Sequence, residues 1–186
     1  MEIEIRLLTQ IEAADIKRIA SGYVSDGKYV VEYTDSALYT TLNLRFVQLD
    51  QPYRKAWDHF DDETVQRYTK TLSHAYSFGA FDDNLLVGIL ISEPQLWNDS
   101  VWVWEFHVAE THRRLGIGRC LMDAVAEKAK LAGLRTIVCE TQTTSAPAIQ
   151  AYRKLGFRLE GVDISYYSNS DYPDGEVAVF MKRRLT

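Results

Sequence analysis

The sequence has few of the features that mark several classes of protein. It has only two cysteines among 186 residues, Cys120 and Cys139, and neither stands at a spacing typical of metal ligands. Both are therefore expected to be reduced thiols in the core. No apolar run reaches the roughly 18–20 residues that a membrane-spanning helix needs. The stretch MEIEIRLLTQ lacks the basic and apolar regions of a secretory signal, so a cytoplasmic location is expected.

Positive charge is also in short supply. The chain has 21 Lys and Arg against 26 Asp and Glu, which gives a formal net charge of −5. A nucleic-acid binder held by phosphate contacts needs a basic surplus, so the charge argues against that class, whereas an acidic surface suits a cationic substrate. Internal repeats and low-complexity linkers are absent from the sequence. The length and the 46% hydrophobic content predict a single globular domain over residues 1–186.

Strand and helix patterns interleave along the chain, with hairpins towards both ends, which indicates a mixed α/β sheet. Strands are predicted at Ile3–Leu7, Tyr29–Tyr33, Tyr39–Leu49 (ended by Pro52), Phe78–Phe81, Leu85–Ser92, Val101–Val108, Thr136–Glu140, Phe157–Tyr167 and Glu176–Arg184. Helices are predicted from a Thr9 cap to about Gly22, from Asp61 to Tyr76, from Ile117 to Ala132 and from Ala146 to Leu155.

A basic glycine turn joins the strand Val101–Val108 to the helix that follows it. The turn reads Arg113-Arg114-Leu115-Gly116-Ile117-Gly118. A helix begins with unpaired N–H groups and a partial positive charge, and glycine allows an anion to approach the backbone. The pattern therefore suggests a phosphate or pyrophosphate site. Taken alone, Gly-Ile-Gly favours a simple tight turn whose arginines are solvated, so its context must decide between the two interpretations.

Two motifs in order carry a resemblance to a known family. Arg113-x-x-Gly116-x-Gly118, placed between a strand and a helix, resembles the acyl-CoA signature of the GNAT N-acetyltransferases. Downstream, Ala148-Ile149-Gln150-Ala151-Tyr152-Arg153-Lys154-Leu155-Gly156-Phe157 resembles that family's A-x-x-x-Y-x-K-x-G-F segment. The resemblance implies a GNAT-like fold: a mostly antiparallel twisted sheet with a splayed parallel strand pair, flanked by helices.

A closer similarity is to the streptothricin acetyltransferase subgroup. The segments that carry it are Glu140-Thr141-Gln142, Leu155-Gly156-Phe157, Val162-Asp163 and Tyr167-x-Asn169, together with the aromatic stretch Tyr29 to Trp57. A role in antibiotic resistance is thus one expectation, although sequences of this kind also serve other amine substrates.

The resemblance implies acetyl-CoA as acyl donor, without a metal. Its contacts are assigned to Phe106, Val108, Arg113, Arg114, Leu115, Gly116, Ile117, Gly118, Arg119, Ser145 and Tyr152. The backbone of Phe106 and Val108, beside a strand bulge, would hold the pantetheine arm, and the Val108 N–H would polarise the thioester carbonyl. The N–H groups from Arg114 to Arg119 would bind the pyrophosphate. Ser145 departs from the family, which often has Asn there, and reaches less far.

An amine is protonated at neutral pH and must lose a proton before it attacks. Glu105 lies where the family often carries an acidic base, acting directly or through water, although a structural or substrate-positioning carboxylate is equally compatible. Glu140 is a rival base. Asp163 is a third acid that could bind a cationic substrate, and Glu140 and Asp163 are both candidate acceptor-binding residues.

Tyr152 matches the tyrosine with which the family often protonates the leaving thiolate. The alternative is a core tyrosine whose hydroxyl only donates a hydrogen bond to the CoA sulfur. Two histidines are weaker candidates for catalytic residues. His112 reads as a solvated neighbour of the phosphate site, and His107 reads as packed rather than catalytic.

Together these observations predict an acetyl-CoA-dependent N-acetyltransferase that acts on a primary amine of a small cationic acceptor, such as a streptothricin-like antibiotic. The alternatives are acetylation of a protein N-terminus or lysine, and a catalytically inactive CoA-binding module. The expected partner is a small-molecule or peptide amine, with neither nucleic acid nor membrane. Because these folds frequently dimerise, a homodimer is one expectation for the assembly.

Overall fold

The computed structural model describes residues 2–57 and 60–185. The chain forms two compact units, each described in turn below. The first unit comprises Met1–Gly22, Ala56–Cys139 and Arg183–Thr186, and the second comprises Tyr23–Lys55 and Glu140–Lys182. No helix in the described ranges is long and apolar enough to cross a membrane. The single domain over 1–186 stays a prediction.

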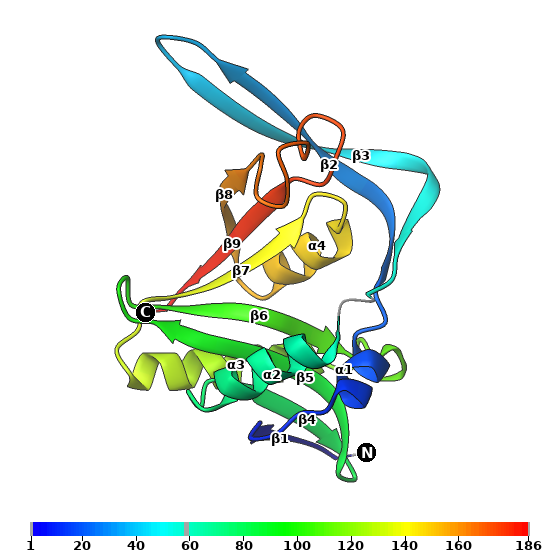
Figure 1. Ribbon diagram of the computed structural model, residues 1–186, viewed down its shortest axis with the longest axis vertical. Helices are drawn as coiled ribbons and strands as arrows, with labels where there is room; N and C mark the ends of the chain where they lie inside the picture. The colour runs from blue at the N-terminus through cyan, green and yellow to red at the C-terminus, as the bar shows by residue number, and fades with distance from the viewer. Residues whose placement is uncertain (1, 58–59, 186) are drawn as a thin grey trace. The chain divides into compact units, whose positions relative to one another are not determined.

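The sheet of the first unit is mostly antiparallel (Figure 1). Its strands are β1 (Ile3–Leu7), β4 (Phe78–Asp82), β5 (Leu85–Gln95), β6 (Ser100–Val108) and the first residues of β7 (Thr136–Gln142), hydrogen-bonded in that order. The β6–β7 pair is parallel and joins Ser100–Val103 to Thr136–Cys139. The pairs therefore cover only the first part of β6, in agreement with the predicted splayed parallel pair.

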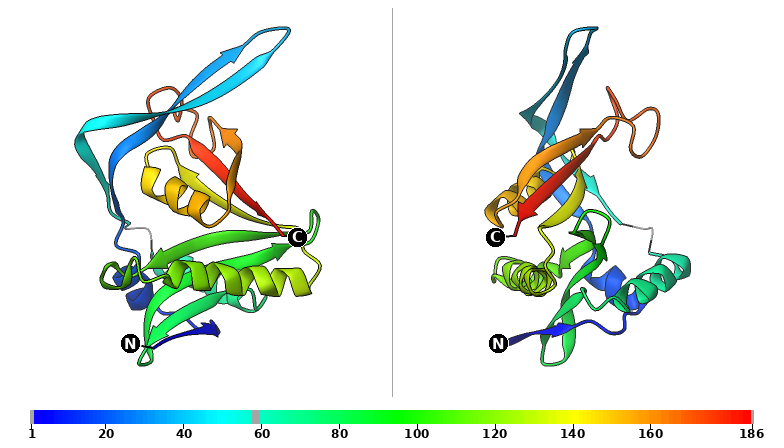
Figure 2. Two further views of the ribbon diagram at one scale, coloured as in Figure 1. Left: turned by 180° about the vertical axis from the view of Figure 1, so that it is seen from behind. Right: turned by 90° about the vertical axis from the view of Figure 1, so that its left-hand side faces the viewer.

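Helices cover both faces of this sheet: α3 lies on one face, and α1 and α2 lie on the other (Figure 2). Their bounds are α1 Ala13–Ile19, α2 Asp62–Leu72 and α3 Ile117–Leu131. The α3 sequence forms a helix because its apolar residues recur at helical spacing, and Ile117, Leu121 and Val125 are buried. The side chain of Asp61 caps α2 by accepting a hydrogen bond from Thr64 N (2.8 Å), as the acidic run predicts.

The second unit combines a long two-stranded hairpin with a small sheet and one helix (Figure 1). The hairpin is β2 (Tyr23–Asp35) with β3 (Thr40–Lys55), and the other elements are the end of β7, β8 (Arg158–Asp163), β9 (Ala178–Arg184) and α4 (Ala146–Lys154). β7, β9 and β8 are neighbours in that order, and β8 runs antiparallel to β9. Tyr29 N donates to Thr143 O (2.9 Å), which fastens the hairpin to the loop before α4.

Several local predictions were wrong in detail. The first helix starts at Ala13 rather than after a Thr9 cap, and its N-cap, Glu12, makes no side-chain capping bond. β3 continues through Pro52 to Lys55, because both strands of a two-stranded ribbon are edges, where proline is tolerated. Cys139 is buried as expected, whereas Cys120 is exposed.

Candidate functional site

The turn before α3 presents a row of backbone donors. A short 3₁₀ turn, Glu110–His112, leads into it, and the chain takes a positive φ at Arg114 (66°) and at Gly116 (83°), the N-cap of α3. In the described part of the chain, the N–H groups of residues 114–118 donate to no protein acceptor. A helix N-terminus combined with such a turn is an anion-binding concavity. The turn therefore fits the pyrophosphate of a CoA molecule.

The two glycines of the turn serve different purposes. A Cβ at Gly116 would meet no atom within 4 Å, so what requires glycine there is its left-handed φ of +83°. A Cβ on Gly118 would approach the Phe106 ring to 3.1 Å, so glycine lets the start of α3 lie against that ring. The open side of the turn at Gly116 is where an anion can approach.

The basic side chains of the turn are exposed, and one of them braces it. Arg113 Nε donates to Val108 O (3.1 Å) and its Nη2 donates to Gly22 O (3.5 Å). Arg113 thus ties the turn to the end of β6 as well as adding positive charge. Arg114, Leu115 and Arg119 are exposed, while Ile117 is buried and anchors the helix.

His112 also holds the turn, which corrects the prediction that it is merely a solvated neighbour of phosphate. Its Nε2 lies 3.2 Å from Asp82 Oδ2 and its Nδ1 lies 2.8 Å from Thr111 Oγ1, and its side chain is only 14% exposed.

We expect His112→Ala to raise the KM for acetyl-CoA about threefold to tenfold, the effect of losing about one hydrogen bond, with little change in kcat. His74→Ala, at an exposed histidine, is the matched control. An unchanged KM for His112→Ala would show that the turn keeps its shape without this bond.

A bulge interrupts β6 next to the end of its parallel pairing. Ile91 pairs with Glu105 and Ser92 pairs with Val103, so Trp104 is the extra residue. Ala109 N donates to Val87 O (2.8 Å). Because antiparallel residues alternate in the direction of their backbone groups, the N–H and C=O groups of Phe106 and Val108 point away from β5. That is the edge on which the β6–β7 pairs end at Val103, and it suits the backbone contacts predicted for the pantetheine arm.

The buried face of β6 carries a carboxylate, Glu105, that contacts side chains from α2 and from β6 itself. Glu105 is 9% exposed, the Tyr68 hydroxyl of α2 donates to its Oε1, and His107 Nε2 lies 2.6 Å from its Oε2. Burial, and then the Glu105 carboxylate, raise the pKa of Tyr68, so this hydroxyl stays a donor. Tyr68 and His107 were missed as partners of Glu105. The period of two in a strand places His107 on the same face as Glu105 but does not show that they bond, and no sequence signal places Tyr68 there.

The second unit holds the residues predicted around α4. Ser145 is buried at the N-cap of this helix, where its carbonyl accepts from Ile149 N (3.2 Å). Tyr152 lies seven residues further, about two turns, on the same helix face. It is 8% exposed, and its ring centroid lies 5.5 Å from that of Phe157. Ser145 and Tyr152 thus lie together on one helix, while the turn and Glu105 belong to the first unit.

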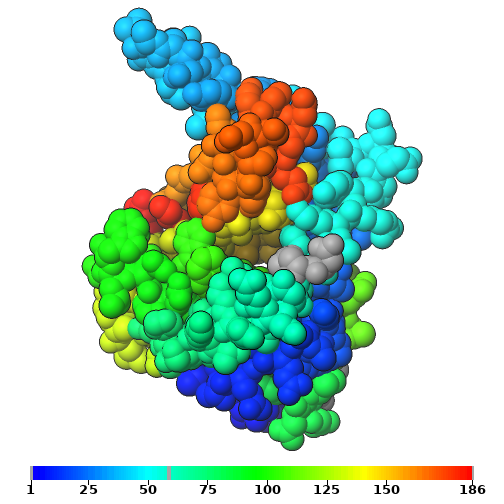
Figure 3. Space-filling view, viewed as in Figure 1, coloured from blue at the N-terminus to red at the C-terminus, as the bar shows by residue number. Residues whose placement is uncertain are grey.

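Acids and aromatic rings gather in the second unit around the other two predicted acids. The Tyr167 hydroxyl donates to Glu140 Oε1, and the Tyr166 ring lies 5.2 Å from that of Tyr167 at an interplanar angle of 83°. Burial raises the pKa of Tyr166, and the charges of Glu140 and Asp163 raise it further. These four residues, Glu140, Asp163, Tyr166 and Tyr167, are called the acidic aromatic cluster below. Figure 3 shows the segment after β8, in orange, at the surface of the second unit.

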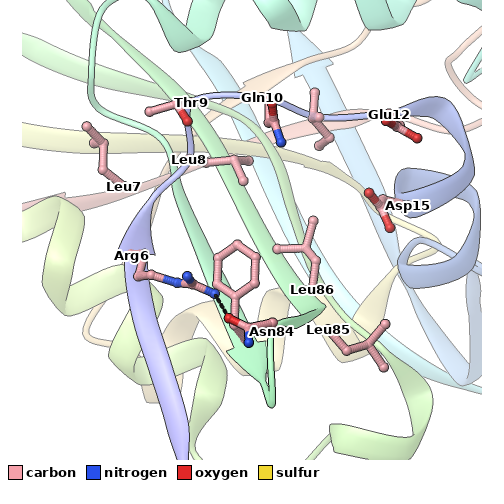
Figure 4. Close-up of a pocket in the computed structure, with 12 residues that line it drawn as sticks. Arg6, Leu7, Leu8, Thr9, Gln10, Glu12, Asp15, Asn84, Leu85 and Leu86 are labelled. Carbon is pink, nitrogen blue, oxygen red and sulfur yellow. Dashed lines mark hydrogen bonds between the residues drawn. The ribbon is translucent and has the colours of Figure 1, made fainter.

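A separate pocket of about 370 Å³ lies in the first unit between β1, the start of α1 and the β4–β5 hairpin (Figure 4). Arg6 lines it, with its guanidinium 3.8 Å from the Phe81 ring centroid and within 3.4 Å of Asn84 Oδ1. None of the predicted site residues lines this pocket, so the candidate site lies elsewhere. The described residues also contain no group of three His, Cys, Asp or Glu arranged to hold a metal ion.

Comparisons with known proteins agree with this geometry. A profile of the Acetyltransferase (GNAT) family matches residues 43–157, more than half of the chain. A streptothricin acetyltransferase of Escherichia coli is 33% identical over 129 residues, 69% of each chain. One from Streptomyces lavendulae is 35% identical over 99 residues, 53% of this chain and 52% of that one. The crystal structure of a nourseothricin acetyltransferase superposes with a TM-score of 0.77 at 29% identity, covering 99% of both chains.

The chain therefore belongs to the acetyltransferase (GNAT) family. It is an acetyl-CoA-dependent N-acetyltransferase, as the two motifs predict.

Proposed function

We propose that the enzyme acetylates a primary amine of a small cationic acceptor, with a streptothricin-like antibiotic as the leading candidate. The observation that carries this proposal is the acidic aromatic cluster of the second unit, where the Glu140 carboxylate accepts from Tyr167 beside the Tyr166 ring and the charge of Asp163 also acts on Tyr166. Carboxylates attract an ammonium group, and aromatic faces bind it further through cation–π contact. The similarity to two streptothricin acetyltransferases supports an acceptor of this charge.

Tyr167 prepares Glu140 for such a partner. Its hydroxyl keeps its proton, because burial and then the neighbouring Glu140 carboxylate raise the pKa of Tyr167. It therefore acts as a fixed donor to Oε1 of Glu140. The negative charge of the Glu140 carboxylate can attract an ammonium group. Glu140 is thus proposed to bind the acceptor, with removal of the amine proton assigned to Glu105 on β6.

The proposed reaction divides its tasks among a few groups of this chain. When bound, acetyl-CoA supplies the activated acetyl thioester. The N–H groups of residues 114–118 hold its pyrophosphate, and the Val108 N–H, which points away from β5, donates to the thioester carbonyl oxygen. The buried Glu105 carboxylate acts in removing a proton from the amine, and Tyr152 protonates the departing sulfur.

The experiment that tests this proposal is a screen of acceptors that measures thiol release from acetyl-CoA. Streptothricin, other small polyamines, lysine peptides and free peptide N-termini are compared at equal concentration. Turnover of cationic small amines is the expected result. Turnover of peptides alone would point instead to a protein N-terminus or lysine as acceptor. Tight CoA binding without any turnover would identify an inactive CoA-binding module.

Variants of the cluster sharpen the assignment. We expect Glu140→Gln to raise the KM for a cationic amine about tenfold, about 1.4 kcal/mol, and to leave the KM for acetyl-CoA unchanged. Glu127→Gln makes the same charge change on the exposed surface of α3 and controls for long-range electrostatics. If both variants raise the KM equally, the effect is one of net charge, and the cluster is not the acceptor site.

A further inference from the structure

The side chains of Glu105 and His107 lie on the face of the first unit's sheet that α3 does not cover. The Phe106 ring lies against Gly118 at the start of α3. Successive strand residues point to opposite faces, so Glu105 and His107 point towards the face that α1 and α2 cover, as Figure 2 shows for these helices. The face of β6 that bears these two residues is thus opposite to the one that carries the phosphate turn.

The hydrogen bonds of Glu105 determine which ring nitrogen of His107 carries the hydrogen. Tyr68 occupies Oε1 as a donor, and Oε2 lies 2.6 Å from His107 Nε2. An ionised carboxylate only accepts hydrogen bonds, so Nε2 carries the hydrogen of this contact. In the neutral ring the lone pair then resides on Nδ1, which is the atom able to take a proton.

Nδ1 of His107 makes no hydrogen bond to the described residues. Within residues 2–57 and 60–185, the Nε2 contact to Glu105 is the only hydrogen bond of this ring. Trp57 and Phe60 hold the ring edge-on, with centroids 6.4 Å and 6.3 Å away. The side chain is 19% exposed, against 10% for that of Glu105, so His107 is the more accessible of the pair.

The neighbours of the pair are mainly apolar or neutral. β5 contributes Ile89 and Ile91, which pair with His107 and Glu105. From α2, Tyr68 donates to Glu105, and the Arg67 guanidinium lies 5.2 Å from the Tyr68 ring centroid. Arg67 is the cationic side chain next to this cluster in the described part of the chain. Among the described residues, the carboxylate in contact with His107 is that of Glu105.

We propose that His107 is the proton acceptor of the acetyl transfer, with Glu105 as the residue that positions it and Tyr68 as the residue that fixes Glu105. This rests on the proposed function and deepens it, because it replaces Glu105 with His107 as the base. One proton of the acceptor ammonium passes to Nδ1, and Glu105 stabilises the imidazolium that forms. The amine nitrogen then bonds to the acetyl carbon while the C–S bond breaks. The second amine proton ends on the thiolate sulfur, and Nδ1 releases its proton to water.

The decisive variant is His107→Gln, whose amide can still donate to Glu105 but cannot take a proton. With any amine that the wild-type enzyme acetylates, we expect kcat to fall at least a hundredfold, the lower range for loss of a general base, while CoA affinity stays unchanged. The rate of the variant should rise about tenfold per pH unit, because only amine that has already lost its proton reacts. His74→Gln is the control at an exposed histidine.

Substitutions of Glu105 and Tyr68 should lower kcat less than His107→Gln does. Glu105→Gln removes the negative charge but leaves His107 in place, so we expect an intermediate loss of kcat. Tyr68→Phe should lower kcat only a few-fold. A wild-type rate and pH profile for His107→Gln would overturn the proposal. It would equally be overturned if Glu105→Gln were inactive while His107→Gln remained active, because the proton would then go to Glu105 itself.

A spectroscopic measurement on the wild-type enzyme does not depend on turnover. Nitrogen-15 NMR of labelled histidine in the free enzyme should show the neutral His107 ring protonated at Nε2 and unprotonated at Nδ1. A ring protonated at Nδ1 would contradict the proposal even if the variants fail to fold. If no amine is turned over by the wild-type protein, the proposed function fails, while this measurement still decides the state of His107.

Discussion

Gly116→Val should weaken CoA binding by at least a hundredfold in calorimetry. The backbone at Gly116 has a φ of +83°, a conformation that costs a residue with a Cβ about 1–2 kcal/mol, and a β-branched one at least as much. Its side chain would also extend into the open space beside the N–H groups of residues 114–118, where the pyrophosphate is expected. An added side chain therefore both strains the turn and blocks the approach of the anion.

Gly133 offers a matched control for the strain alone. It ends α3 with a φ of +74°, and a Cβ there would also meet nothing within 4 Å. Gly133→Val should therefore lower the free energy of unfolding about as much as Gly116→Val does, yet leave CoA affinity intact. Gly116→Asn separates the two effects further, because Asn tolerates this backbone conformation but still places a side chain in the turn. Equal CoA affinity in all three variants and the wild type would show that the pyrophosphate does not bind at this turn.

The first unit could be predicted largely because its signals are local. Alternating and helical periodicity located β1, β4–β6 and α3, and the glycine turn followed from residues close together in sequence. A bulge in β6 was expected from the family resemblance alone, and its position at Trp104 is shown only by the structure, since no local signal in the strand marks it. The start of α1 was misplaced because Thr9 and Glu12 imitate a capping box that the folded chain does not use.

The parts that escaped prediction depend on contacts between distant residues. Glu105 was singled out, but its donor Tyr68 lies 37 residues earlier on another element, so periodicity cannot connect them. The sequence predicts His107 as a packed residue, and its aromatic neighbours do pack it, yet its hydrogen bond to Glu105 gives the ring a defined tautomer. The sequence predicts Glu140 and Asp163 as acceptor-binding residues, but no local pattern shows that the Tyr167 hydroxyl donates to Glu140, 27 residues away. Side-chain chemistry in this protein is thus decided by tertiary packing that local patterns do not encode.

Tyr152→Phe should lower kcat about a hundredfold and leave the KM for acetyl-CoA within about twofold, if this hydroxyl protonates the leaving thiolate. The expected loss is at the lower end for a general acid, because a thiolate with a parent pKa of about 8.5 leaves fairly well without help. The variant should fold, since the ring that packs against Phe157 is retained.

Tyr29→Phe is the matched control for Tyr152→Phe, because both tyrosines are 8% exposed and belong to the second unit. The Tyr29 hydroxyl accepts a hydrogen bond from Arg153 Nη1 (3.1 Å), so its removal costs a structural contact and should leave kcat unchanged. The oxygen-ester analogue of acetyl-CoA gives a second test. An alkoxide needs a proton more than a thiolate does, so Tyr152→Phe should lose more activity with the oxygen ester than with the thioester. An equal loss with both donors would mean that Tyr152 only positions the acyl donor, and a wild-type rate would leave it no role in the chemistry.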